Sequence, residues 1–250
     1  MTLAGWRVPM MASLLVWVIL WEIIGRFELL LLFPPFSEVL GALGEVIGAA
    51  SFAEAMRLTL ACYLGGLALA VLVGVPLGFL MGLSRTADGL LNMWVNLFLS
   101  APLSALVPVI MILLGMGWPT VVATVFMFAV WIIALDARAG VRHVAPSLME
   151  MARSFGASPA QRLRIVAMAA LPEILAGVRL GVIRGVKGVV IGQLLVSIIG
   201  VGALFQLYGQ NFLMAHFWAL ILMLFALALG ASALVARAEA RVEHYAGSRG

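Results

Sequence analysis

Long apolar runs recur along the whole chain, and they restrict its possible folds more than any other feature. A run of about 20 apolar residues is long enough to cross a bilayer as an α-helix. The mean hydropathy is +1.16 over 250 residues, with 64% hydrophobic and 10% charged residues, which is too apolar for a soluble domain. Strands of a transmembrane barrel would alternate in polarity, and these runs do not. We therefore predict an all-α, polytopic membrane protein.

The runs predict about six transmembrane helices within a single domain, residues 1–250. The expected spans are about Pro9–Ile24, Leu58–Leu83, Leu90–Leu114, Pro119–Leu135, a fifth within Glu173–Ile199, and Phe212–Ala236. Pro76 and Pro108 lie inside two of them and are expected to kink them. The first run follows the basic residue Arg7, as in a signal peptide. Because it ends in WEIIGRFE without a cleavage-site pattern, a retained first helix is the preferred interpretation.

The positive charges lie in short connections between the runs and predict the orientation of the chain. The net charge is +4, and Lys187 is the only lysine. If the N-terminus is cytoplasmic, only Arg26 and Arg57 fall outside, so the positive-inside rule selects this orientation with both termini in the cytoplasm. The arginines expected inside are Arg7, Arg85, Arg138, Arg142, Arg153, Arg162, Arg164, Arg237, Arg241 and Arg249. This distribution indicates membrane topology rather than nucleic-acid binding.

A segment between the first two spans is amphipathic. Pro34 and Pro35 stop a helix, and Ser37 is a suitable N-cap for a new one over about 37–50. Apolar residues then recur at helical spacing, with Glu38 and Glu45 on the other side. The pattern predicts a helix lying on the outer membrane surface, and an irregular loop is the alternative.

Two spans carry small residues at every fourth position, which lets helix backbones approach closely in lipid. The first ridge is Gly66, Ala70, Gly74, Gly78 and Gly82, and the second is Gly177, Gly181 and Gly185. We prefer packing within one subunit for both ridges. A seam between two subunits is the alternative.

The sequence contains no pattern that supports enzyme chemistry or a metal site. A P-loop needs a glycine-rich turn followed by Lys-Ser or Lys-Thr, and the only lysine lies in RGVKGVV. His143, His216 and His244 are far apart, and none lies in an H-E-x-x-H pattern. Cys62 is alone, so no intrachain disulfide is possible. We expect no catalytic residue, metal or cofactor in this chain.

The stretch EMARSFGASPAQ, residues 150–161, interrupts the apolar sequence with polar residues. Pro146 can begin a helix that continues to Phe155. Gly156 is suited to the left-handed conformation that ends such a helix.

A second helix is then expected to begin at once. Ser158 is its N-cap, with Pro159 at the first helical position and Gln161 three residues after the cap. Leu171-Pro172 is expected to break this helix before the chain re-enters the membrane. The product is a compact, basic cytoplasmic loop at about 140–172, shaped to be held by a partner rather than to cross lipid.

This loop resembles the cytoplasmic EAA loop of bacterial ABC-importer permease subunits. Glu150, Ala152 and Gly156 match that motif at its spacing, and Met151 replaces the first alanine. The Leu-Pro that ends the motif is displaced by three residues, from 168–169 to 171–172. The stretches FPPFSEVL, GVPLGFLMGLSR and LPEILAGVRLG also resemble the nitrate/sulfonate/taurine-type branch, so the resemblance covers nearly the whole chain.

The resemblance implies a type I ABC-importer permease fold in the bacterial inner membrane. Such a subunit carries a solute and hydrolyses nothing. Two permeases, here expected as a homodimer, would pair with two P-loop ATPase subunits that bind ATP and Mg, and with one extracytoplasmic binding protein. The expected solute is small and anionic, nitrate-, sulfonate- or taurine-like or a related organic compound. The residues expected to couple to the ATPase are Glu150, Met151, Ala152, Arg153, Gly156, Ala157 and Ser158.

Arg184 and Lys187 lie one helical turn apart and share a helix face. If the fifth span begins just after Pro172, both lie deep in the bilayer and can line a pathway for an anion. If the true span begins at about Val189, both reach the lipid headgroups instead. Gln193 is a third candidate for the pathway, and it stands where many members of the branch have a glutamate.

A self-sufficient secondary transporter is the alternative to an importer subunit. That class favours inverted repeats and intramembrane carboxylates that couple ions. We find no obvious repeat, and the acidic residues Glu22 and Asp136 lie close to span ends. The importer subunit is therefore the preferred prediction.

Overall fold

The computed structural model describes residues 2–3, 6–7, 10–28, 30, 32–196 and 199–247, with side chains over 12–28, 30, 32–196, 199–234 and 237. Within these ranges the chain is almost wholly helical, which confirms the all-α prediction. A minimal antiparallel pair, β1 (Thr2–Leu3) and β2 (Trp6–Arg7), precedes the helices. The helices are α1 (Met10–Arg26), α2 (Phe36–Gly48), α3 (Ala50–Leu83), α4 (Arg85–Ser100), the short 3₁₀ helix η1 (Leu103–Leu106), α5 (Val107–Leu114), α6 (Trp118–His143), α7 (Pro146–Ser154), α8 (Pro159–Val196), α9 (Gly200–Gln210) and α10 (Met214–Gly247).

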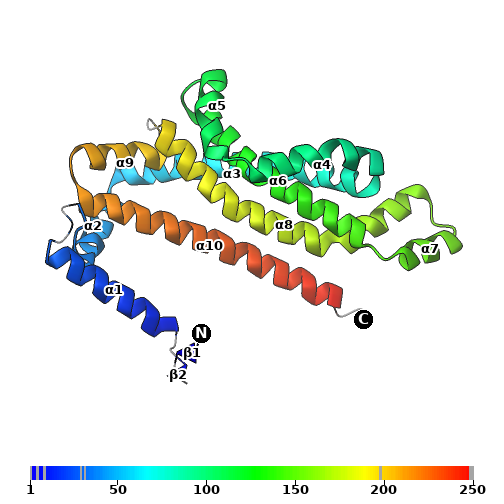
Figure 1. The fold of residues 1–250 in the computed structure, drawn as a ribbon, viewed down its shortest axis with the longest axis horizontal. Coiled ribbons are helices and arrows are strands. Elements are labelled where there is room, and N and C mark those ends of the chain that lie inside the picture. The colour runs from blue at the N-terminus through cyan, green and yellow to red at the C-terminus, as the bar shows by residue number, and fades with distance from the viewer. Residues whose placement is uncertain are drawn as a thin grey trace.

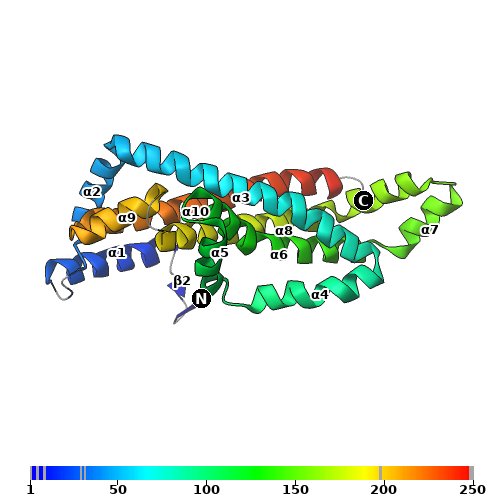
Figure 2. The same cartoon turned by 90° about the horizontal axis from the view of Figure 1, so that it is seen from above.

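The molecule is elongated, with the long helices running along its length (Figures 1 and 2). The hairpin around α7 lies at one end, here called the α7 end. Helices α2 and α9 lie at the opposite end, here called the α2 end.

Helix α6 forms the centre of the bundle and packs along α3 in the parallel direction. Gly66 lies against Val125, and Gly82 lies against Val141. Residue numbers therefore increase in the same direction along both helices. A Cβ on Gly66 would lie 2.5 Å from the Cβ of Val125, closer than side chains can approach. The first glycine ridge therefore packs within the chain, as preferred from the sequence.

Helix α8 packs along the other side of α6 in the antiparallel direction. Gly177 lies against Asp136, and Gly188 lies against Val125, so the two helices advance in opposite directions. A Cβ on Gly177 would lie 2.6 Å from the Cβ of Asp136. The second ridge is thus also used inside one chain.

The third expected span is broken rather than kinked. Helix α4 ends at Ser100, and η1 with α5 continues at an angle of 96° to it. The break falls at Ala101-Pro102, where the proline disfavours the helical conformation of the residue before it. Ala101 is extended at ψ 146°. Pro108 lies in the first turn of α5, where proline is tolerated, so the predicted kink at Pro108 was wrong.

By length and composition, four helices can each cross a bilayer: α3, α6, α8 and α10. The bent pair of α4 with η1 and α5 makes a fifth if it is counted as one span. Helix α1 has 17 residues, at the lower limit of about 17 for a spanning helix. The described residues thus support four or five of the six predicted spans.

The fifth expected span is part of a longer helix. Helix α8 runs unbroken through Pro172, so the predicted break at Leu171-Pro172 was wrong. Proline removes one backbone hydrogen bond, but packing on both sides of it holds the helix together. Ala170 and Ile174 are both buried in a cluster with Ala137 and Val141 of α6.

Helix α2 confirms a helix between the first two spans, although Ser37 does not cap it. Pro35 is the N-cap, and the Ser37 backbone N–H and hydroxyl both donate to the Glu22 carboxylate of α1 at 2.9 Å. Val39 and Val46 on the apolar face of α2 are buried in a core cluster with α9 and α10. This face therefore contacts protein, and the position of α2 on the outer membrane surface stays a prediction.

Candidate functional site

The turn between α7 and α8 has the local geometry that the sequence predicts. Gly156 adopts a left-handed conformation with φ +73°. Its N–H donates to the Arg153 carbonyl, and the Ala157 N–H donates to the Ala152 carbonyl, both at 2.9 Å. These two bonds form a Schellman motif, which ends α7 abruptly.

Helix α8 begins with a capping box. The Ser158 backbone N–H donates to the Gln161 side-chain oxygen at 2.7 Å, and the Gln161 N–H donates to the Ser158 hydroxyl at 3.3 Å. Both ends of the turn are therefore satisfied by hydrogen bonds to their own neighbours, which fixes the angle between α7 and α8 locally.

The hairpin presents apolar side chains to the surroundings together with charged ones. Met151 is 51% exposed and Phe155 is 84% exposed, while Glu150 and Arg153 are exposed beside them. Ala152 is buried and faces the body of the molecule. Exposed apolar residues set among charged ones at a protruding corner are typical of a surface that binds another protein.

Ionic contacts connect three helices at the α7 end. Arg138 and Arg142 of α6 donate to the Asp88 carboxylate of α4 at 3.0 Å and 2.7 Å. His143 of α6 lies 2.9 Å from the Glu173 carboxylate of α8. Asp88 was not singled out from the sequence. Its place in the first turn of a helix was the only signal, because its arginine partners are brought to it by the fold.

Arg184 and Lys187 lie deep along α8 rather than at its end. Because α8 is continuous and antiparallel to α6, residues 181–188 lie beside residues 125–133, in the apolar part of α6. Arg184 is half-buried and Lys187 is exposed. This geometry favours the deep placement over a span that begins at Val189, since α8 ends at Val196.

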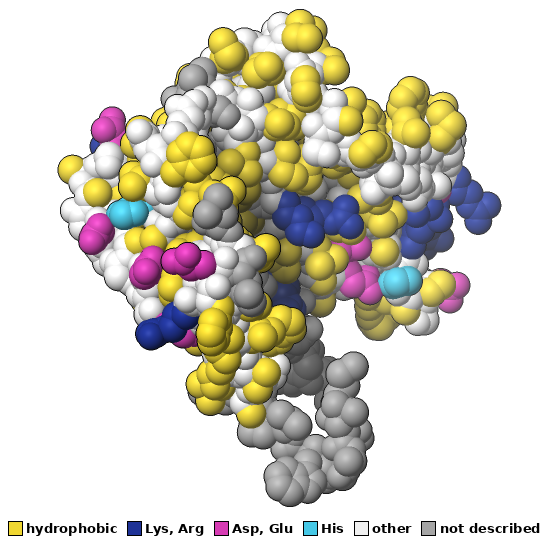
Figure 3. Space-filling model, turned by 60° about the vertical axis from the view of Figure 1, so that its left-hand side comes forward, with side chains coloured by type: hydrophobic (Ala, Val, Ile, Leu, Met, Phe, Trp, Pro, Cys, Tyr) yellow, Lys and Arg dark blue, Asp and Glu magenta, His cyan; other side chains and the backbone are white. Residues whose placement is uncertain are grey.

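The surroundings of the two cations differ. Arg184 acts electrostatically on the Asp136 carboxylate of α6, as does Glu173. Lys187 makes no hydrogen bond or ion pair with the residues that the structure describes. Figure 3 shows positive side chains enclosed by hydrophobic ones on one face of the molecule. An exposed cation in an apolar span requires water, a partner or an anion.

Gln193 lies in the interior, 2% exposed, where α3, α8 and α9 meet. Its side-chain oxygen is 3.0 Å from the Thr59 hydroxyl, and that hydroxyl also accepts from the Val201 N–H at 3.1 Å. Gly200, with φ +62°, lets the chain pass over this contact without a side chain. Within one chain Gln193 therefore joins helices, and its role in a pathway stays a prediction.

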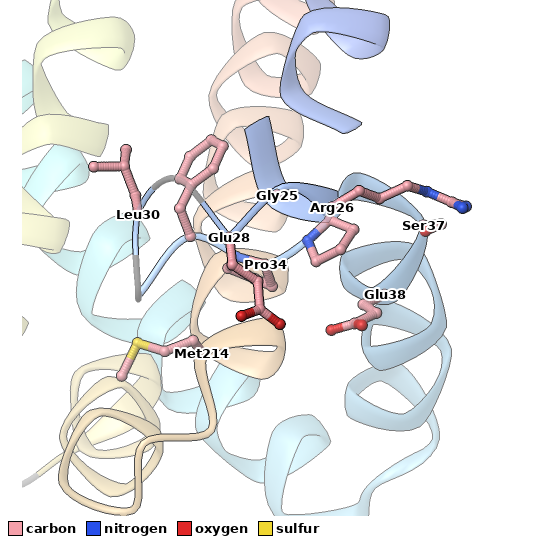
Figure 4. Close-up of a pocket in the computed structure, with 10 residues that line it drawn as sticks. Gly25, Arg26, Glu28, Leu30, Pro34, Ser37, Glu38 and Met214 are labelled. Carbon is pink, nitrogen blue, oxygen red and sulfur yellow. The ribbon is translucent and has the colours of Figure 1, made fainter. Parts of the chain in front are cut away.

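A cavity with a volume of about 620 Å³ lies at the α2 end. Its lining includes Glu28, Glu38, Ser37 and Met214. Figure 4 shows Arg26 extending away from this space. No residue predicted as functional from the sequence lies in it. The structure thus separates this cavity from both the hairpin and the two cations.

The arrangement suits movement of a solute rather than its chemical conversion. The helices are long and apolar, one cation lies unpaired in a span, and a self-supporting hairpin protrudes at one end. Among the described residues, no group of three or more His, Cys, Asp or Glu side chains converges to hold a metal ion. These features define a membrane-spanning transport subunit.

Comparison with known proteins places this subunit in a family. The model of binding-protein-dependent transport-system inner membrane components matches residues 74–244. The taurine transport system permease protein TauC of Escherichia coli is 31% identical over 93% of this chain and 91% of its own length. The bicarbonate transport system permease protein CmpB of Synechococcus elongatus is 29% identical over 59% of this chain and 54% of its own.

A solved structure shows the same fold. An inward-facing MetNI methionine ABC transporter aligns with a TM-score of 0.60 and 22% identity, covering 74% of this chain and 93% of the matched chain. The chain belongs to the family of binding-protein-dependent transport-system inner membrane components, and it is the permease subunit of an ABC importer. Such a subunit resides in the inner membrane and works with an ATPase and a binding protein. The secondary-transporter alternative is not favoured.

Proposed function

We propose that this permease moves a small anionic solute past Arg184 and Lys187, and that α8 transmits motion to these residues from the α7 hairpin. The observation that supports this proposal is the continuity of α8. One helix joins the capping box at Ser158 to the unpaired cation at Lys187. At about 1.5 Å per residue, these two points are about 40 Å apart on one rigid element.

The hairpin is proposed as the contact with a cytoplasmic P-loop ATPase. Met151 and Phe155 supply the exposed apolar contact, and Glu150 and Arg153 supply charges at its rim. ATP and Mg bind to that separate subunit, and hydrolysis occurs there. The hairpin would then lie in the cytoplasm, and so would both termini, as the positive-inside rule indicates.

An anion is the solute class that the two cations support. Arg184 has Asp136 as a counter-charge nearby, while Lys187 keeps its charge available. The names of two relatives specify taurine, a zwitterion that carries an anionic sulfonate group, and bicarbonate, an anion. We propose a solute of this kind, delivered by an extracytoplasmic binding protein.

Two copies of this chain are proposed to form the complete pathway with two ATPase subunits. In an isolated chain Lys187 lies on an open surface. A second copy would enclose that surface and so let the cation face water instead of lipid.

Uptake by the reconstituted importer tests this proposal. This permease, its ATPase and its binding protein are placed in vesicles, and uptake of labelled taurine and bicarbonate is followed with and without ATP. We expect ATP-dependent uptake of an anion that stops when the ATPase is omitted. Uptake that persists without the ATPase would contradict the importer proposal, and uptake of cations alone would contradict the anion.

A further inference from the structure

Helix α4 carries a row of polar residues that the proposed function has not used. Asp88, Asn92, Asn96 and Ser100 recur at every fourth position. Residues at this spacing lie on one side of a helix. The row begins at the ion cluster of the α7 end and stops at the break before Pro102.

The exposed surface of α4 is divided into a polar side and an apolar side. With about 100° of rotation per residue, each step of four along the row turns it by about 40°, from Asn92 next to the buried face of the helix toward Ser100 on the exposed side. Asn96 and Ser100 are both exposed, and Asn92 is half-buried. Leu97 and Trp94 project farther round the helix and are 52% and 49% exposed. Lipid suits the apolar side and not the polar one.

The two asparagines do not satisfy each other fully. The Asn96 side-chain N–H₂ donates to the Asn92 side-chain oxygen at 3.0 Å and to the Asn92 carbonyl at 2.7 Å. Both amide hydrogens of Asn96 are used by these two bonds, so the groups that remain are the side-chain N–H₂ of Asn92 and the side-chain oxygen of Asn96. In hydrocarbon such groups are costly, and they are found facing water, a ligand or another helix.

The row lies in the inner part of the span, between the α7 end and the level of the two cations. Helix α4 contacts α6 at Asp88 with Arg138, and again where Phe98 stacks on Trp131 with ring centroids 4.4 Å apart. The two asparagines lie between these contacts, at the level of Asp136. Ser100 lies beyond them, toward the level at which Arg184 adjoins α6.

We propose that Asn92, Asn96 and Ser100 line the inner half of the translocation pathway, between the cations of α8 and the α7 end. This proposal rests on the proposed function. The Asn92 amide and the Ser100 hydroxyl offer hydrogen-bond donors to the oxygens of a sulfonate or carboxylate-like anion after it leaves Arg184 and Lys187. Asp88 lies at the end of the row near the α7 end. Because its carboxylate is paired with two arginines, it repels an anion less than a free carboxylate would.

Cysteine labelling in the assembled importer tests the proposal. In a Cys62→Ser background, single substitutions Asn96→Cys and Ser100→Cys are compared with Trp94→Cys and Leu97→Cys on the same helix. A membrane-impermeant thiol reagent is supplied from the side of the ATPase. We expect labelling at 96 and 100 that is lost when ATP is bound without hydrolysis, and protection at 94 and 97.

Equal protection at all four positions would overturn the proposal. So would a disulfide between two Asn96→Cys copies together with no labelling, because the row would then be a contact between subunits. Uptake gives a second measurement: Asn92→Leu should reduce uptake about tenfold, the equivalent of one hydrogen bond to a charged group, and Asn92→Ser should restore most of it. ATP-dependent uptake by the Cys62→Ser parent, measured in the same vesicles, shows separately whether the proposed function stands.

Discussion

Gly156 sets the shape of the α7 hairpin through its backbone conformation alone. A Cβ at this position would meet nothing within 4 Å, so any cost of substitution arises from φ +73° and not from crowding. We expect Gly156→Val to cost about 1–2 kcal/mol in the turn and to reduce ATP-driven uptake at normal expression. Gly156→Asn is the matched control, since asparagine tolerates this conformation. Uptake by the valine variant equal to that of the parent would contradict the coupling role.

Glu150 is an exposed charge at the rim of the proposed ATPase contact. Reversing such a charge mainly slows association and changes its salt dependence. We expect Glu150→Lys to lower the amount of ATPase that co-purifies, in a manner that depends on salt. Glu54→Lys makes the same change at an exposed position of α3, near the α2 end, and should have no effect. If both variants retain the ATPase equally across a salt series, Glu150 does not take part in the ATPase contact.

Lys187 has no ion pair among the residues that the structure describes, and its charge is its proposed contribution. We expect Lys187→Gln to reduce anion uptake about tenfold or more, the equivalent of a lost charge-assisted hydrogen bond. Lys187→Arg keeps the charge and should keep most of the uptake. ATPase co-purification serves as the folding control for both variants. Normal uptake by the glutamine variant would show that the charge reaches headgroups or a structural partner.

At the scale of the helix, the close approach of α3 to α6 predicts a sharp difference between two glycines. A Cβ on Gly78 would overlap the carbonyl oxygen of Ala134, whereas a Cβ on Gly230 of α10 would meet nothing within 4 Å. Overpacking costs about 1–3 kcal/mol, while alanine in an open helix position gains about 0.5–1 kcal/mol. We expect Gly78→Ala to lower the melting temperature in detergent and Gly230→Ala to leave it unchanged or raise it. Equal melting temperatures would contradict the close packing.

Helices with local signals could be predicted from the sequence, and breaks with non-local causes could not. The apolar runs located most spans, and the caps at Gly156 and Ser158 were predicted because each bonds to residues within five positions. Pro172 was expected to break α8, but packing against α6 outweighs the lost hydrogen bond. The turn of 96° after Ser100 was assigned to the wrong proline, since either proline can end a helix and only the fold decides.

Only part of the candidate site could be predicted from the sequence. The hairpin residues follow from a motif with local geometry, and Arg184 with Lys187 follow from charge in an apolar run. The Asp88 cluster and the row on α4 were missed. The Asp88 cluster depends on arginines about 50 residues away in the sequence. The polar row on α4 is visible in the sequence as a spacing of four, but its environment is known only once α4 is placed beside α6.

At the scale of the whole molecule, the account depends on α8 acting as one rigid element. It carries the capping box at its beginning, the proline in its middle and the two cations farther along. Helix α6 supports it over most of this length, and the contact between His143 and Glu173 attaches the two helices near the α7 end. We therefore expect a displacement of the hairpin by a partner to move the cations as well.

Accessibility at position 187 tests this central claim most directly. A Lys187→Cys, Cys62→Ser permease is assembled with its ATPase and binding protein, and labelling by an impermeant thiol reagent is compared with and without ATP and substrate. The account predicts a labelling rate that changes on ATP binding, falls when substrate is present, and no longer responds to ATP after Gly156→Val. The coupling through α8 would be contradicted by a labelling rate that is unchanged by ATP and by substrate in an importer that still hydrolyses ATP normally.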